Sequence, residues 1–206
     1  MMWLFFDHLW STPAGVEMKR TFVSALRLLG RFARGPVSND LGKAIEDSYV
    51  LRDEINAKFD RVRSLADGVL FEFGPSRSSD LELRTLIRRW APQLRALFLM
   101  RIALLKYRLQ ATGFELPDAV RVRQEAYDAA SARMLEEMAD RIENQIPGIG
   151  SGAEERDELK QRLHEAETEV SRELPRSQAQ SFLTVLHGID ALTDSLAKEV
   201  ATDLHS

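Results

Sequence analysis

The stretch from Asn56 to Pro117, NAKFDRVRSLADGVLFEFGPSRSSDLELRTLIRRWAPQLRALFLMRIALLKYRLQATGFELP, decides the fold of this chain. Apolar residues recur along it with a period near 3.6, which is the spacing of amphipathic helices that bury one face. The pair Gly74-Pro75 interrupts the period in the middle of the stretch, and such a pair breaks a helix. The stretch therefore predicts a helical hairpin that turns at Gly74-Pro75.

The first helix of the hairpin is predicted to begin at Asn39 or Asp40, both good capping residues. It would run for about 34 residues, or about 50 Å at the rise of an α-helix. Its predicted buried stripe consists of Leu41, Ile45, Leu51, Ile55, Phe59, Val62, Ala66, Val69, Leu70 and Phe73.

The second helix of the hairpin carries two local signals. Ser79-Asp80-Leu81-Glu82 has the spacing of a capping box, which predicts a helix start at Ser79. Pro92 lies inside the apolar period, and proline removes one hydrogen bond and clashes with the preceding turn. The sequence therefore predicts a kink or a break between Arg88 and Pro92.

Outward from the hairpin, four more stretches with helical periodicity are bounded by proline and glycine. One follows Pro13 and ends at Gly35-Pro36, and another opens at Pro117. The last two follow the glycine-rich segment 147–152 and Pro175. No stretch reads as a strand with a partner. The prediction is an all-α, elongated antiparallel bundle of about six helices.

The breaks also suggest a division of the chain. Residues 13–146 would form the main helical bundle and residues 153–206 a C-terminal helical pair. Residues 1–12 begin with the apolar and aromatic sequence MMWLFFDHLW and are interpreted as a membrane-proximal segment.

Residue chemistry argues against several function classes. The net charge is -4, which does not suit a basic nucleic-acid binder, and the chain has no cysteine for a thiol nucleophile or a zinc ribbon. The four histidines lack the spacings of zinc or di-iron sites, and no glycine-rich phosphate loop or nucleophile elbow occurs. We therefore expect no catalytic residue, no metal and no cofactor, and a protein that is not an enzyme.

Basic residues follow the aromatic start closely, as they do on the cytoplasmic side of a membrane end. The residues interpreted as a membrane edge are Trp3, Phe6, Trp10, Lys19, Arg20, Arg27 and Arg31. The alternative is that the aromatic start folds back as a cap on the bundle.

Arginines are dense between residues 77 and 108, whereas acidic residues dominate 124–173. The two regions can form helix faces that attract each other. The other interpretation is that the basic face meets lipid head groups or an anionic ligand, for which Arg88, Arg95 and Arg101 are the candidate contacts.

Three phrases carry a resemblance to a known family: FDRVRSLADGVLFEFGPSR (59–77), IRRWAPQLRALFLMRIALLKYRLQ (87–110) and GFELP (113–117). They resemble the C-terminal soluble region of fusaric acid resistance family proteins, which export aromatic acids or several drugs across the bacterial inner membrane. The resemblance covers about residues 1–145, and the family's spanning helices are absent from the sequence.

The resemblance implies that Met1 to Trp10 is the end of a spanning helix. It implies a cytoplasmic domain with a structural or assembly role, which cannot transport on its own. The implied partners are the membrane-spanning part, inner-membrane lipid and sister subunits. A periplasmic adaptor and an outer-membrane channel would belong to the full assembly. The alternatives are a stand-alone helical interaction module and an anion or aromatic-acid sensor that uses the arginine-rich helix.

Overall fold

The computed structural model describes residues 12–35, 40–109, 115–144 and 152–204. These residues form six α-helices and no strand, so the all-α prediction is confirmed. The helices are α2 (Ala14–Arg34), α3 (Leu41–Gly68), α4 (Arg77–Arg108), α5 (Asp118–Asn144), α6 (Gly152–Glu173) and α7 (Arg176–Asp203). A short 3-10 turn, η1 (Val69–Phe71), follows α3.

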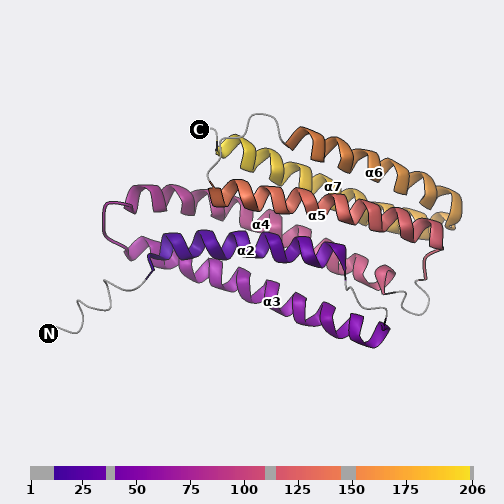
Figure 1. Ribbon diagram of the computed structural model, residues 1–206, viewed down its shortest axis with the longest axis horizontal. Coiled ribbons are helices and arrows are strands. Elements are labelled where there is room, and N and C mark those ends of the chain that lie inside the picture. The colour runs from indigo at the N-terminus through magenta and orange to yellow at the C-terminus, as the bar shows by residue number, and fades with distance from the viewer. Residues whose placement is uncertain (1–11, 36–39, 110–114, 145–151, 205–206) are drawn as a thin grey trace.

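The helices run along one long axis and alternate in direction (Figure 1). α2 lies in the centre, where it contacts α3 and α5 extensively and α4 on another side. α6 packs on α5 and α7, while α7 packs mainly on α4. The architecture is therefore the elongated antiparallel bundle that the sequence predicts.

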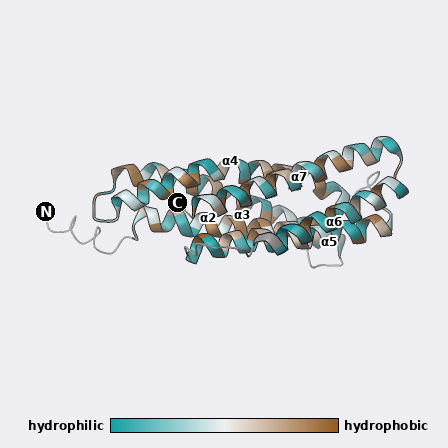
Figure 2. Ribbon diagram, turned by 90° about the horizontal axis from the view of Figure 1, so that it is seen from above, coloured by the Kyte–Doolittle hydropathy of each residue, from teal (hydrophilic) through white to brown (hydrophobic). Residues whose placement is uncertain are grey.

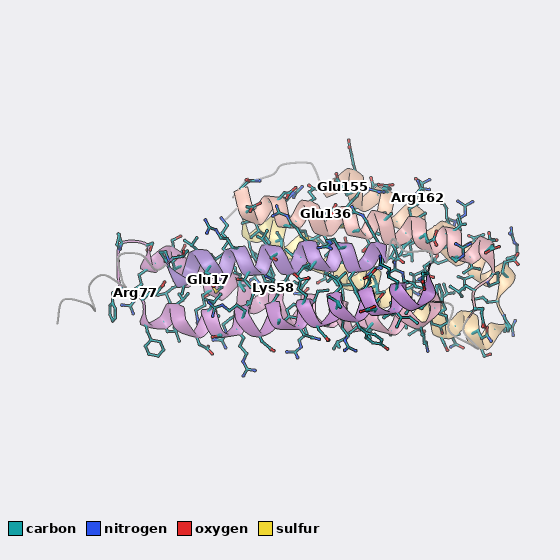
Figure 3. The ribbon with its side chains drawn as sticks, turned by 60° about the horizontal axis from the view of Figure 1, so that its bottom comes forward. Glu17, Lys58, Arg77, Glu136, Glu155 and Arg162 are labelled. Atoms are coloured by element: carbon teal, nitrogen blue, oxygen red, sulfur yellow. The ribbon has the colours of Figure 1, made fainter. Side chains whose placement is uncertain are left out.

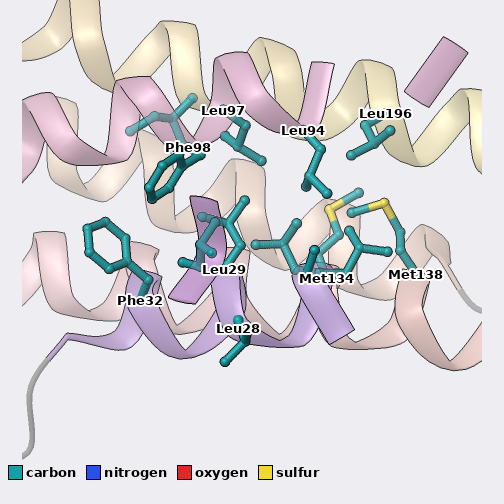
Figure 4. Close-up of a cluster of buried hydrophobic side chains, with 14 of the residues drawn as sticks. Leu28, Leu29, Phe32, Leu94, Leu97, Phe98, Met134, Met138 and Leu196 are labelled. Carbon is teal, nitrogen blue, oxygen red and sulfur yellow. The ribbon is translucent and has the colours of Figure 1, made fainter. Parts of the chain in front are cut away.

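Helix α2 occupies this centre because it has apolar or small residues on most of its circumference. Twelve of its 21 residues are buried, and Phe22, Leu26 and Leu29 have no exposed surface. Figure 4 shows Phe32 of α2 opposite Phe98 of α4, and Leu29 of α2 on the side that faces Leu97 of α4. The charged residues of α2, among them Arg20 and Arg31, lie on its remaining exposed side, as expected of an amphipathic helix with a wide apolar face.

One continuous core joins all six helices. It includes Ile55 of α3, Trp90 of α4, Met134 of α5, Val170 of α6 and Leu186 of α7. Apolar residues gather on the inner faces of the ribbon and polar residues on its outer faces (Figure 2). Helices α6 and α7 thus share their core with the helices of residues 13–146.

The hairpin turns at Gly74-Pro75 as predicted. Gly74 has a φ of 148°, a conformation that glycine adopts without steric cost. The predicted capping box is wrong, because α4 already begins at Arg77 and Ser79 lies inside its first turn. The Asp80 N–H donates to the Ser76 carbonyl over 2.9 Å, so the turn itself starts the helix.

Pro92 does not break α4, which continues from Arg77 to Arg108. The predicted break is therefore wrong, and the alternative of a kink stays a prediction. Trp90 and Leu94 on either side of the proline have no exposed surface. Burial of these side chains offsets the cost of a proline in a helix interior, about 3 kcal/mol for the lost hydrogen bond and the ring clash together.

Candidate functional site

The hairpin end of the bundle carries a cluster of exposed apolar side chains, which we call the aromatic tip. It consists of Leu70, Phe71 and Phe73, exposed by 43%, 78% and 85%. The sequence-based prediction that Leu70 and Phe73 belong to the buried stripe is wrong. The stripe ends because α3 gives way to the 3-10 turn η1, and this change of pitch rotates the following residues away from the core.

The start of α2 lies beside the aromatic tip. Glu72, between the two phenylalanines, accepts a hydrogen bond from the Ala14 backbone N–H. Arg77 lies over the ring of Phe73, with 5.3 Å between the guanidinium carbon and the ring centroid. Figure 3 shows Arg77 at this end of the molecule. Two exposed aromatic rings and a cation therefore mark the end of the bundle at which α2 begins.

The predicted membrane-edge residues are only partly described. Trp3, Phe6 and Trp10 lie outside the described residues. Lys19, Arg20, Arg27 and Arg31 lie on α2, and their role at a membrane edge stays a prediction. Arg27 forms ion pairs of 2.6 Å with Asp140 and with Glu143 of α5.

These contacts favour the charged forms of the groups that form them. Hydrogen bonding to Arg27 lowers the pKa of Glu143, because a bonded cation stabilises the carboxylate. Burial lowers the pKa of Lys19, and the charge of Glu143 opposes that shift. Arg34 forms a further ion pair of 2.5 Å with Glu136. Two of the basic residues of α2, Arg27 and Arg34, thus pair with acidic residues of α5.

The three candidate anion contacts, Arg88, Arg95 and Arg101, do not lie together. Arg101 and Asp128 are buried, with side chains 2% exposed, and they form an ion pair between α4 and α5. Arg101 also donates to the hydroxyl of Ser131. Its guanidinium thus faces protein groups, which leaves Arg88 and Arg95 as the exposed members of the set.

A second arginine completes the buried cluster. Arg108 lies with its Nε 3.8 Å from Asp128 Oδ2 and donates to the Phe32 carbonyl over 2.7 Å. Burial is the main cause that lowers the pKa of Arg108. Burial disfavours the charged form of Tyr127 too, and for a phenol this raises the pKa. The Tyr127 ring lies 5.9 Å from the Arg101 guanidinium carbon. Two buried cations thus share one carboxylate at the α4–α5 contact.

Arg88 and Arg95 line a groove between α3 and α4, which we call the arginine groove. Arg63 of α3 lines the opposite side, together with Asp60 and Asp67. The groove has a volume of about 540 Å³. Its apolar lining consists of Phe59, Val62, Ala66, Ile87, Ala91 and Pro92. It exists because α3 packs mainly on α2 and makes few contacts with α4.

The described residues show no cluster of histidine, cysteine and acidic side chains that could hold a metal ion. His187 forms a hydrogen bond of 2.5 Å with Glu167 and is half exposed, as expected of a histidine on a helix surface. Within the described ranges, no helix is long and apolar enough to cross a membrane.

Comparisons with family models, with curated proteins and with solved structures each found no match. Sequence reasoning missed the aromatic tip, Arg63 as part of a groove, and Asp128 as the buried partner of Arg101. The only sequence signal for the tip is the pair of glycines, Gly68 and Gly74, that bracket it.

Proposed function

We propose that this chain is a helical domain of a bacterial inner-membrane efflux protein for aromatic acids or drugs, of the fusaric acid resistance type. It would lie on the cytoplasmic face of the membrane and have a structural and assembly role, with no transport on its own. The aromatic tip is the observation that carries the proposal, together with the resemblance of residues 59–77 and 87–110.

The tip supports this function because exposed aromatic rings beside a cation suit the membrane–water boundary. Phe71 and Phe73 are exposed by 78% and 85%. A cluster of exposed apolar side chains is typical of a surface that contacts a membrane or another protein. The chain also enters α2 at this end. The apolar segment 1–12 and the tip would therefore meet the same lipid surface.

The partners of this domain would be the spanning part of the exporter, inner-membrane lipid and sister subunits in a homo-oligomer. A periplasmic adaptor and an outer-membrane channel would join through the full assembly. We propose no nucleic-acid partner, no cofactor and no enzymatic activity. Multidrug resistance would be a property of the whole exporter.

Vesicle flotation tests the proposal. The full chain, a version without residues 1–12, and Phe71→Ser/Phe73→Ser are floated with vesicles of anionic or neutral lipid. We expect the full chain to float with anionic vesicles and both altered versions to lose most of that binding. Val122→Ser is the control, since Val122 is 53% exposed on α5, away from the tip. Equal and negligible binding by all versions would overturn the membrane contact.

The alternative, a stand-alone interaction module, predicts that residues 1–11 cover the tip. Iodide quenching of Trp3→Phe and Trp10→Phe variants without lipid separates the two ideas. Trp90 has no exposed surface and serves as a protected internal reference. Strong protection of Trp3 and Trp10 in the free chain would favour the module.

A further inference from the structure

The arginine groove places positive charge from two helices around an apolar floor. Arg63 of α3 lies on one side, and Arg88 and Arg95 of α4 lie on the other. All three side chains are exposed. Within the described part of the chain, none of the three forms an ion pair or a hydrogen bond through its side chain.

The two arginines of α4 lack acidic neighbours on their own helix. Ion pairs within a helix join residues three or four apart. Those positions around Arg88 hold Arg84, Thr85, Ala91 and Pro92. Around Arg95 they hold Ala91, Pro92, Phe98 and Leu99. The α4 side of the groove therefore presents two uncompensated cations.

The acidic residues of the groove belong to α3 and flank its arginine. Asp60 lies three residues before Arg63 and Asp67 lies four residues after it. Both are within helical reach of Arg63, so they offset its charge on α3. An anionic group entering the groove would accordingly be held on the α4 side.

The floor between the charged sides is apolar and elongated. Phe59, Val62 and Ala66 follow one another along α3, and Ile87 and Ala91 run alongside on α4. Seven residues of α-helix span about 10 Å. The volume of about 540 Å³ lies in the range of about 300–1,000 Å³ that is usual for small-molecule sites.

We propose that the arginine groove binds a single-chain amphipathic carboxylate, with the head group at Arg88 and Arg95 and the alkyl chain along Ala91 and Pro92, over the edges of Phe59 and Val62. Arginine suits the head group because its planar guanidinium binds carboxylate through paired hydrogen bonds. The alkyl chain would itself leave water and cover Ala91 and Pro92 of α4, whereas the α3 residues of the floor are already nearly buried. This inference does not rest on the proposed membrane contact, and it leaves Arg101 in its structural pair with Asp128.

The experiment is a titration of the uniformly 15N-labelled full chain with octanoate, followed by amide chemical shifts. We expect saturable shifts in residues 59–67 and 87–95. Octanol, which has the same chain without the charge, should bind at least about tenfold more weakly. The affinity for octanoate should fall by a similar factor in the Arg88→Gln/Arg95→Gln variant.

Two controls make the result specific. Arg176→Gln removes another exposed arginine without an observed partner, at the start of α7, and should leave octanoate affinity unchanged. Phe71→Ser/Phe73→Ser should also leave it unchanged, which separates the groove from the aromatic tip. The inference is overturned by the absence of binding, by shifts confined to the tip, or by equal affinity of the double arginine variant. Failure of vesicle flotation would not affect any of these outcomes.

Discussion

Arg101 of α4 and Asp128 of α5 form an ion pair in which each side chain is only 2% exposed. Arg108 approaches the other oxygen of the same carboxylate. One buried acid therefore serves two arginines that lie about two turns apart on α4. Removal of the acid and removal of one arginine should therefore lower the stability of the bundle by different amounts.

Asp128→Asn should be the more damaging change at this contact. It leaves two buried guanidiniums without a counter-charge, and breaking a buried pair typically costs about 3–5 kcal/mol. Arg101→Met should cost clearly less, because Asp128 keeps Arg108 and the methionine replaces much of the lost apolar volume. Urea unfolding monitored by circular dichroism measures both changes.

The matched control for this pair is Arg34→Gln, which removes an exposed pair with Glu136 between α2 and α5. That change should cost less than about 1 kcal/mol, as exposed ion pairs usually do. If Arg101→Met proved as costly as Asp128→Asn, the shared-carboxylate account would be wrong.

Gly35 is the second position where we predict a large effect. Its φ is 81° and its ψ is 177°, a region that residues other than glycine avoid at a cost of about 1–3 kcal/mol. A Cβ atom there would also lie 1.6 Å from an Arg108 guanidinium nitrogen. Gly35→Ala should therefore lower the free energy of unfolding by at least that amount in a urea titration.

Gly68 offers the opposite expectation for the same substitution. It lies in the last turn of α3 with helical backbone angles, and a Cβ atom there would meet only Ala14, at an ordinary distance of 3.8 Å. Gly68→Ala should stabilise the protein by about 0.5–1 kcal/mol, because alanine loses less backbone freedom on folding. A loss of stability at Gly68 as large as that at Gly35 would argue against backbone geometry as the cause.

The sequence identified the helices well because their ends depend on local chemistry. Gly35 ends α2 and Gly74-Pro75 turns the hairpin, as their backbone preferences predict. Asp40 caps α3, and its side chain accepts from the Gly42 and Lys43 N–H groups.

The charge partners were not predictable, since they depend on which helices become neighbours. The sequence shows that the arginine-rich and acidic segments carry opposite charges, but it does not show which residues pair. The structure pairs Arg101 with Asp128 inside the core and leaves Arg88 and Arg95 at the surface. Likewise, a helical period can be extended through Leu70 and Phe73, but only the 3-10 turn shows that these side chains leave the core.

Asp190 of α7 gives a prediction for the dependence of stability on pH. Burial, followed by the charge of Asp194, raises the pKa of Asp190 above its ordinary value of 3.8, whereas Lys160 and His187 oppose the shift. A carboxyl whose pKa is higher in the folded state binds protons more readily there, so its contribution to stability falls as the pH rises through that pKa.

Asp190→Asn should therefore stabilise the protein at neutral pH and lose this advantage in acid, below the ordinary pKa. The gain should stay under about 1 kcal/mol, because water screens a half-exposed carboxyl. Thermal unfolding of both proteins across this pH range measures the difference. A constant difference between the two melting temperatures would exclude titration of Asp190 as its source.

Pro92 provides the last prediction, since α4 continues through a residue that lacks a backbone N–H. The Arg88 carbonyl therefore has no donor four residues later. Pro92→Ala supplies that donor in a helix whose neighbours Trp90 and Leu94 are already buried. We expect the free energy of unfolding to rise by about 1–3 kcal/mol. Pro175→Ala is the control, because Pro175 precedes the first turn of α7, where an N–H has no partner within the helix. A loss of stability with Pro92→Ala would instead show that the core packing around Trp90 requires the backbone geometry that proline imposes.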